Sequence, residues 1–454
     1  MRRFTFIGRM GVLDNGPVPN AQPDATPIDI QFVDTFRRLE YGIGSALDAL
    51  RVLGLTPKEV AVDLVVLSAL VNAADTRISR AVNSQNGWTR EIDLIVPVSD
   101  PRLWDDQATL LERLLRFLTG DLWRLFFRSR PAGFERIAQP PTNLALARFD
   151  NVALFSGGLD SLVGAIDQFA SGARPLLVSH YWDSEASKAQ NALLHFLERH
   201  YPKQEIKSVR VRLGFDKHHA DTGEIEDTQR GRSFLFFALA VLAASALGSN
   251  SQVLVPENGL IGLNVPLDPL RLGSLSTRTT HPFYMARVND LLRQLSLSVV
   301  LANPYRHMTK GEMLAACKDL GFLQEIVGQS MSCSSPAKAR YKKLSPRHCG
   351  TCVPCLIRRA SIEVGLGAVD PTLYTVPSLT ARKLDTRAAE GEHVRSFQLM
   401  IEKLAVNPAA AKLLVHVPGP LSDAPQEIPQ FVGVFERGMS EVAQLLRSVT
   451  AGPI

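Results

Sequence analysis

The segment Ser156-Gly157-Gly158-Leu159-Asp160-Ser161 holds the residues best suited to bind an anion. It follows an apolar run, 151–155, that predicts a strand, and precedes 162–166, which predicts a helix. Unpaired N–H groups and the dipole at a helix start both favour negative charge. Two glycines let a phosphate approach the main chain, and the Ser and Asp side chains can hold phosphate oxygens or a hydrated cation. We therefore predict a phosphate-binding turn, with an ordinary capped strand–helix turn as the alternative.

Four of the five cysteines form a second candidate site. Cys333 is followed by Cys349, Cys352 and Cys355, a spacing that can wrap a tetrahedral ion. Soft thiolates suit zinc or an iron–sulfur cluster. Four cysteines leave no open coordination position, so Zn²⁺ here would be structural and would hold residues 334–348, which have little apolar content. Separate, unmetallated thiols are the alternative.

Two neighbours of this cluster are expected to stay outside it. Cys317 lies on the helix predicted after Lys310 and is expected to be a small core residue. His348 could replace one cysteine as a ligand, but the adjacent Cys349 argues against it. Clustered cysteines favour a metal site in a reducing compartment over disulfides, so we expect a cytoplasmic protein.

Composition indicates a globular protein of roughly three domains. The chain has 454 residues, 45% of them apolar and 21% charged, which is ordinary for a folded soluble protein. A net charge of +5 suits anionic ligands but does not by itself indicate nucleic-acid binding, and we expect no direct nucleic-acid partner. The amino terminus lacks the apolar core of a signal peptide, and the longest apolar run, 234–248, is too short to span a bilayer. No membrane association is expected.

The elements that must position these residues follow two patterns. From Asn151 on, strands and helices alternate, which predicts a parallel sheet with helices on both faces. The predicted strands are 152–155, 175–180, 207–213 and 252–255, and the predicted helices are 160–170, 185–199 and 232–247. Ligands of such sheets bind beyond the carboxyl ends of the strands, where the Ser-Gly-Gly turn lies.

The flanking regions give weaker signals. Thr56-Pro57-Lys58-Glu59 is a capping-box pattern that predicts a helix to about Val82. Further predicted elements are a strand at 92–98, a helix at 107–118, a strand at 121–128, a linker at 139–143, and helices at 394–404 and 432–446 on either side of a proline-rich connection. We expect an N-terminal α+β extension (1–145), the nucleotide-binding domain (146–325), a four-cysteine zinc segment (326–365) and a helical C-terminal extension (366–454).

The chain resembles a known enzyme family. Ser-Gly-Gly-Leu-Asp-Ser is similar to the PP-loop of ATP pyrophosphatases, and together with the cysteine cluster it resembles QueC, the 7-cyano-7-deazaguanine synthases. The similarity covers about 151–362. Within it, Gly231-Arg232-Ser233, Thr280-His281-Pro282-Phe283, Thr309-Lys310-Gly311-Glu312, Ser332-Cys333 and Cys349–Arg358 match family segments. The fold expected is therefore a PP-loop (adenine nucleotide alpha hydrolase-like) α/β sheet.

Departures from the family pattern are also clear. The family's Tyr-Gly-Gln is here Tyr181-Trp182-Asp183, Ser233 replaces an Asn, and residues 276–280 replace an Asp-Cys-Arg stretch. With large extensions on both sides, the chain looks most like the QueC-like QatC proteins of Qat anti-phage systems, which would act beside partner proteins encoded in the same operon.

The resemblance implies a ligase that forms C–N bonds. The carboxylate of 7-carboxy-7-deazaguanine would attack ATP, releasing pyrophosphate, and ammonia or an amine of a partner protein would displace AMP. Phosphate binding is assigned to Ser156, Gly157, Gly158, Leu159, Asp160, Ser161 and Arg232, with Asp160 also near Mg²⁺. Asp160, Ser161 and Lys310 are the expected catalytic residues. Tyr181, Trp182, Glu257, Asn258 and Arg278 are weaker candidates for the base pocket.

Two other functions remain open. A PP-loop tRNA thiolase would carry an iron–sulfur cluster on the cysteines, although their late position argues against it. A scaffold that binds nucleotide without turning it over is the second alternative, and the intact Ser-Gly-Gly-Leu-Asp-Ser argues against that one.

Overall fold

A computed structural model gives the fold of the chain. It describes residues 2–19, 23–34, 38–85, 87–141, 148–181, 183–215, 224, 226, 228–248, 250–268 and 278–454. Trp182, residues 276–277 and the second half of the expected linker, 142–143, lie outside the described residues.

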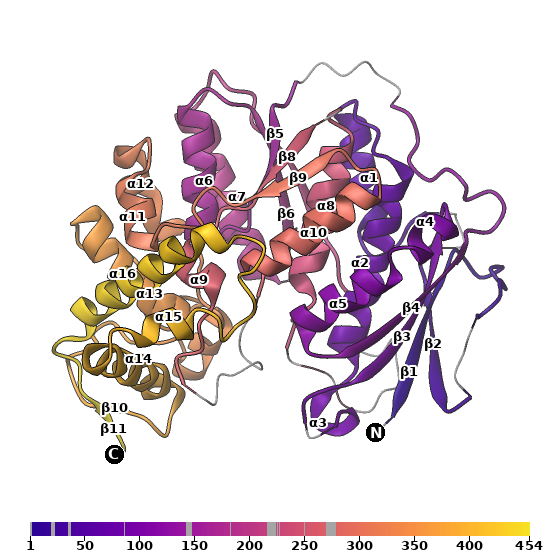
Figure 1. Cartoon of the computed structure of the whole chain (residues 1–454). Coiled ribbons are helices and arrows are strands. Elements are labelled where there is room, and N and C mark those ends of the chain that lie inside the picture. The colour runs from indigo at the N-terminus through magenta and orange to yellow at the C-terminus, as the bar shows by residue number, and fades with distance from the viewer. Residues whose placement is uncertain are drawn as a thin grey trace.

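A five-stranded parallel sheet forms the centre of the molecule (Figure 1). Its strands are β5 (Asn151–Leu154), β6 (Pro175–Tyr181), β7 (Lys207–Arg212), β8 (Ser251–Leu254) and β9 (Val299–Ala302), in the order β7-β6-β5-β8-β9. Every neighbouring pair is parallel. The first four strands and the alternation with helices confirm the prediction, whereas β9 was not anticipated.

Helices cover both faces of this sheet, as predicted. α6 (Leu159–Ala170) and α7 (Ser184–His200) share a core with Ala153, Phe155 and Leu177. α8 (Arg232–Ser245) and α10 (Pro282–Gln294) share another with the alternate residues Val152 and Leu154. The alternation follows from the two-residue period of a strand.

The strand order fixes where a ligand would bind. The chain runs outward from β5 through β6 to β7 and then returns to the other side of β5 with β8 and β9. A crevice opens at such a reversal, beyond the carboxyl ends of the two central strands. The residues that follow β5 are the Ser156–Ser161 turn, and those that follow β8 include Glu257 and Asn258.

The N-terminal unit is a second parallel sheet and not the expected α+β arrangement. Its strands are β1 (Arg3–Arg9), β2 (Ala25–Gln31), β3 (Glu91–Val98) and β4 (Leu122–Ser129), in the order β2-β1-β3-β4 with every pair parallel. Its helices are α1 (Ile43–Val52), α2 (Glu59–Arg77), α3 (Arg80–Asn83), α4 (Pro101–Asp105) and α5 (Ala108–Thr119). β3, β4 and α5 confirm three sequence predictions.

Helix α2 joins the two sheets into one core. Almost all of its residues are buried, and it packs against both β3 and α8. A helix that is apolar on all sides must be covered on all sides. The N-terminal unit and the central sheet consequently share a single hydrophobic core, with α2 beside α8 in Figure 1.

The predicted capping box at the start of α2 does not form. Lys58, not Thr56, precedes the helix and makes no side-chain cap. The Glu59 carboxylate instead accepts hydrogen bonds from the main-chain N–H groups of Ile137 and Ala138, each at 2.8 Å. This tertiary contact replaces the local one, and the helix ends at Arg77 rather than near Val82.

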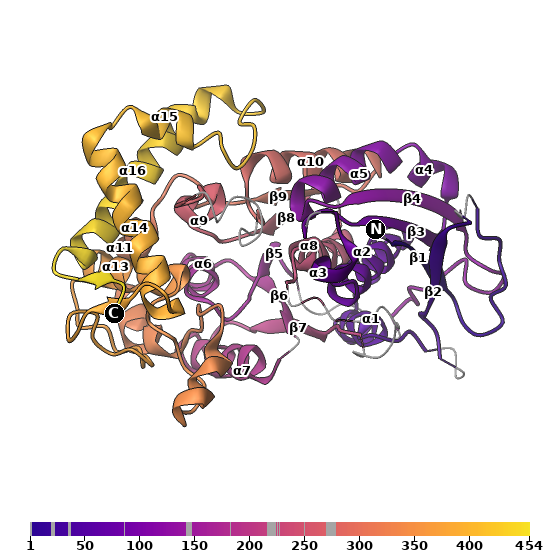
Figure 2. The ribbon, with the colours of Figure 1, turned by 90° about the horizontal axis from the view of Figure 1, so that it is seen from below.

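The remaining elements are mainly helical, as expected of the C-terminal region. They are α9 (Gly259–Leu263), α11 (Lys310–Ala315), α12 (Leu320–Ile326), α13 (Val353–Leu366), α14 (Ala389–Val406), α15 (Ala410–Leu414) and α16 (Ile428–Leu446), with a short parallel pair β10 (Leu384–Asp385) and β11 (Ala451–Gly452). α16 packs on α9, α13 and α14. Figure 2 shows these helices and the N-terminal sheet at opposite ends of the molecule, with the central sheet between them. Of the helices described, none has the length and apolarity needed to cross a bilayer.

Candidate functional site

The Ser156–Ser161 turn, where the sequence predicts an anion site, lies at the start of α6, and part of its main chain is already bonded. The N–H of Gly158 donates to Ser156 Oγ and that of Leu159 donates to Ser332 Oγ, both at 3.2 Å. For the N–H groups of Asp160 and Ser161, at the start of α6, no acceptor is found in the described part of the chain. A serine hydroxyl thus occupies one donor of the helix start, and two further donors remain for an anion.

A side chain at position 157 would be strained and crowded. Its φ is +84°, and a Cβ would lie 3.1 Å from Cγ and 3.3 Å from the main-chain nitrogen of Gln190. The buried Gln190 side chain is a part of the site that the sequence did not reveal. Its Nε2 donates to the carbonyl oxygens of Ser156 and His180, each at 3.2 Å, and so ties the turn to the end of β6.

Asp160 lies in a charged contact with Lys310 and Asn258. The Lys310 ammonium is 2.7 Å from Asp160 Oδ1, and both side chains are nearly buried, with 6% and 13% of their areas exposed. Asn258 Nδ2 donates to Asp160 Oδ2 at 2.7 Å, and the Asn258 N–H donates to the same oxygen at 3.2 Å. Lys310 therefore neutralises Asp160, and it can act on a phosphate only by sharing or leaving this contact.

Lys310 reaches this position from the first turn of α11. Thr309 caps the helix, and the reciprocal bond between the Glu312 side chain and the Thr309 main chain completes the capping box. The Thr309 hydroxyl also donates to Glu441 of α16, and the Gly311 N–H donates to Glu441 at 3.3 Å. The C-terminal extension thus fixes the helix start that carries Lys310.

Glu257 is the titratable group of the site. Thr280 donates a hydrogen bond to its carboxylate. The pKa of Glu257 is raised to about 7, mainly by burial and also by the negative charge of Asp160, while Thr280 and Lys310 lower it. A carboxyl group of this kind can accept or release a proton near neutral pH, as general acid–base catalysis requires.

Arg232 supplies a cation without a described partner. It is the first residue of α8 and is half-buried; burial lowers its pKa, and the negative charge of Asp183 opposes that change. No hydrogen bond or ion pair of its side chain is found in the part of the chain that the structure covers. Its charge also contributes to the low pKa of His180, about 4, which arises mainly from burial of the imidazole at the end of β6. A half-buried arginine of this kind suits an anionic ligand.

Two weaker candidates lie further out. The Tyr181 ring packs under the Arg210 guanidinium, with 5.1 Å between the carbon of that group and the ring centroid. Arg278 Nη1 donates to the carbonyl of Phe117 at 2.8 Å and its guanidinium covers the Phe117 ring at 4.7 Å. Arg278 thus contacts α5 of the N-terminal unit, and no described contact joins it to the turn.

The four cysteines converge as their spacing predicts. The sulfur atoms of Cys333, Cys349, Cys352 and Cys355 all lie within 4.8 Å of one another. Main-chain N–H groups donate to Cys333 Sγ from Ser335 and Cys349, and to Cys349 Sγ from Thr351 and Cys352, at 3.2–3.5 Å. Such donors stabilise thiolates, and four sulfurs at this separation fit a tetrahedral ion such as zinc.

The residues just before Cys333 also hold the Ser156–Ser161 turn in place. The Met331 N–H donates to the carbonyl of Gly157 at 2.8 Å. Ser332, whose hydroxyl accepts from Leu159, donates its own N–H to His348 Nε2 at 3.1 Å. Because His348 Nε2 accepts this bond, His348 is a support for Ser332 and not a member of the sulfur cluster.

Arg358 completes this support from helix α13. Its fully buried guanidinium donates to Ser330 Oγ at 2.8 Å, to the Val327 carbonyl at 2.6 Å and to Thr372 Oγ1 at 3.0 Å. Arg358 therefore holds residues 327–330, which directly precede the two residues, Met331 and Ser332, that contact the Ser156–Ser161 turn.

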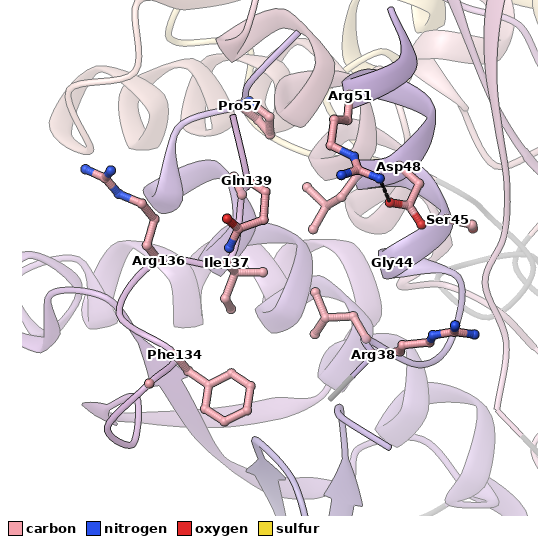
Figure 3. A pocket seen from close by; sticks show the side chains of 14 residues that line it. Arg38, Gly44, Ser45, Asp48, Arg51, Pro57, Phe134, Arg136, Ile137 and Gln139 are labelled. Atoms are coloured by element: carbon pink, nitrogen blue, oxygen red, sulfur yellow. Dashed lines mark ion pairs between the residues drawn. The ribbon is translucent and has the colours of Figure 1, made fainter. Parts of the chain in front are cut away.

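A separate cavity lies away from these residues. It has a volume of about 780 Å³ and lies in the N-terminal unit, between α1 and residues 133–139. Figure 3 shows Phe134 and Ile137 directed inward, while the guanidinium groups of Arg38 and Arg136 point away and Arg51 pairs with Asp48. No predicted site residue lines it, and its charges do not converge as those of an anion site do.

Comparison with known proteins adds no assignment to this geometry. No protein-family model matches the chain, and no curated protein matches it.

Proposed function

We propose that the protein is a QueC-like, ATP-dependent ligase that adenylates the carboxylate of a 7-deazaguanine, 7-carboxy-7-deazaguanine, and transfers the acyl group to ammonia or to an amine of a partner protein. The observation that carries this proposal is the turn itself. The helix-start amides of Asp160 and Ser161, for which the described residues offer no acceptor, lie at the reversal of strand order in a parallel sheet. Arg232, Lys310 and Glu257 lie on neighbouring elements.

The residues divide the work as follows. The N–H groups of Asp160 and Ser161, with the glycines beside them, would bind oxygens of the triphosphate. Arg232 and Lys310 would oppose the charge that grows on the departing pyrophosphate. A Mg²⁺ ion bound with ATP would neutralise phosphate charge, and Asp160 would hold it after releasing Lys310. Zinc on the four cysteines would be structural, because no ligand position is left open.

Glu257 suits the second half of the reaction. An attacking amine must lose a proton as the C–N bond forms and AMP departs with the electrons of the broken acyl–phosphate bond. A carboxylate with a pKa of about 7 is the group in this site able to take that proton at neutral pH. The lost Tyr-Gly-Gln segment and the two extensions support a protein amine as acceptor, in anti-phage defence and in the reducing cytoplasm.

The adenylation step is tested by exchange of labelled pyrophosphate into ATP. We expect exchange that depends on 7-carboxy-7-deazaguanine, and its loss in Asp160→Ala. The matched control is Asp48→Ala, whose side chain is 74% exposed on α1 and which should leave exchange unchanged. Equal exchange by wild type and Asp160→Ala would refute the site assignment, and no exchange by the wild type would favour a nucleotide-binding scaffold.

The acceptor and the metal are tested separately. Mass spectrometry of operon partners incubated with the enzyme, ATP and the deazaguanine acid should show a mass increase on one partner if an amine of that partner is the acceptor. Metal analysis should give one zinc per chain, whereas iron and a brown colour would favour the tRNA thiolase.

A further inference from the structure

The loop between Cys333 and Cys349 is strongly basic, although the net charge of the whole chain is small. We name residues 334–348 the basic loop. It contains Lys338, Arg340, Lys342, Lys343 and Arg347 and not one Asp or Glu, although the net charge of the entire protein is only +5. The first four side chains are exposed. None of the five forms an ion pair within the portion of the chain that is described, so their charge is available to a partner.

An exposed aromatic ring stands in the middle of these cations. Tyr341 is 75% exposed, although tyrosine rings are usually largely buried. Its neighbour Arg340 lies with its guanidinium carbon 5.3 Å from the ring centroid. Cations on both sides of an open aromatic ring combine the two features that bind single strands, phosphate neutralisation and base stacking.

The basic loop is held in shape before any partner binds. Ala339 is buried beneath it, and the N–H groups of Lys343 and Leu344 donate to the carbonyls of Arg340 and Ala339 at 2.9 and 3.2 Å. Cys333 and Cys349 close its two ends, joined by the Cys349 N–H bond to Cys333 Sγ at 3.3 Å. A loop held in this way loses little conformational freedom when it binds.

Ser332, which lies just before the basic loop, contacts the Ser156–Ser161 turn. Ser332 accepts from Leu159, and Ser334 is only two residues further, a distance of at most about 7 Å along the chain. The basic loop therefore begins beside the Ser156–Ser161 turn.

We propose that the basic loop binds a single-stranded nucleic acid, with its cations on the phosphates and Tyr341 stacked on a base. Any polyanion could pair with the cations of the loop. Each nucleotide carries both a negative phosphate and a planar base that can stack on Tyr341, whereas an acidic side chain carries only the negative charge. This inference goes beyond the proposed function and does not depend on it, because binding is measured without ATP.

The test is fluorescence anisotropy of a labelled single-stranded oligonucleotide of about 12 nucleotides, titrated with the full-length zinc protein at several salt concentrations. With four exposed cations engaged, log K should fall with log salt with a slope of about −2.8, that is, about −0.7 for each neutralised phosphate. Lys342→Ala with Lys343→Ala should reduce the slope by about 1.4. Tyr341→Ala should weaken binding roughly tenfold and leave the slope unchanged.

Two control variants separate the local effect from net charge. Lys403→Ala with Lys412→Ala removes the same charge from exposed positions of the C-terminal extension and should not change binding. Lys342→Arg with Lys343→Arg keeps the charge of the loop and should keep the slope. The proposal is overturned if the wild type does not bind at low salt, or if the Ala and Arg variants bind alike. It is also overturned if a polyglutamate of equal charge displaces the oligonucleotide as well as unlabelled oligonucleotide does, which would indicate an acidic protein partner.

Discussion

Replacing Lys310 with Met should destabilise the protein by about 2–3 kcal/mol, because it leaves the Asp160 carboxylate buried without its counter-charge. Removal of one member of a buried ion pair costs about 3–5 kcal/mol. The loss expected for Lys310→Met is smaller than this range because Asn258 still donates two hydrogen bonds to Asp160 and 13% of the Asp160 side chain is exposed. Urea unfolding measures the loss of free energy.

A double-mutant cycle distinguishes the pair from general damage. Asp160→Asn alone should cost a similar amount, since it strands the ammonium, whereas Lys310→Met with Asp160→Asn should lie within about 1 kcal/mol of the wild type. The surface pair of Lys188 and Glu185, 3.0 Å apart with the lysine 72% exposed, gives the control. Lys188→Met should cost less than about 0.5 kcal/mol. Additive effects of the two site variants would refute the contact.

Three further predictions concern single features of the site. Gly157→Ala should cost about 1–2 kcal/mol more than Gly172→Ala in urea unfolding, because both have positive φ, +84° and +77°, but only Gly157 faces a neighbour; equal losses would contradict the contact. The pKa of Glu257 is raised from 4.5 to about 7, so relative to Glu257→Gln the wild type should lose roughly 3 kcal/mol of stability as pH rises from below 4.5 to above 7; a pH-independent difference would contradict the raised pKa. Cys352→Ser should release zinc and lower Tm by roughly 10 °C, measured by metal analysis and thermal unfolding, and retained zinc with an unchanged Tm would argue against a four-thiolate site.

The sequence predicts four strands of the central sheet from two kinds of local pattern. β5 and β6 are short, mainly apolar runs, whereas β7 alternates polar and apolar residues with the two-residue period of a strand. β9, at Val299–Ala302, is also apolar but only four residues long, and it was not predicted. In the N-terminal unit, β2 carries exposed residues and was missed, as was β1. Parallel pairing of such strands depends on α2, whose burial on all sides is a tertiary property.

In the candidate site, too, local sequence patterns could be recognised and tertiary contacts could not. Glycines at a strand–helix turn and cysteines at metal spacing are local patterns, so both were found. Gln190 and Ser332 support the turn through single hydrogen bonds from distant parts of the chain. A lone polar residue carries no sequence signal for such a contact. Asn258 was suggested for a base pocket, and its observed contact is with Asp160.

The proposed reaction depends on binding of the ATP triphosphate at the start of α6. A crystal structure of the protein with α,β-methylene-ATP would show where the triphosphate binds. We predict phosphate oxygens within hydrogen-bond distance of the N–H groups of Asp160 and Ser161. A nucleotide bound elsewhere, with those two amides unchanged, would contradict the account.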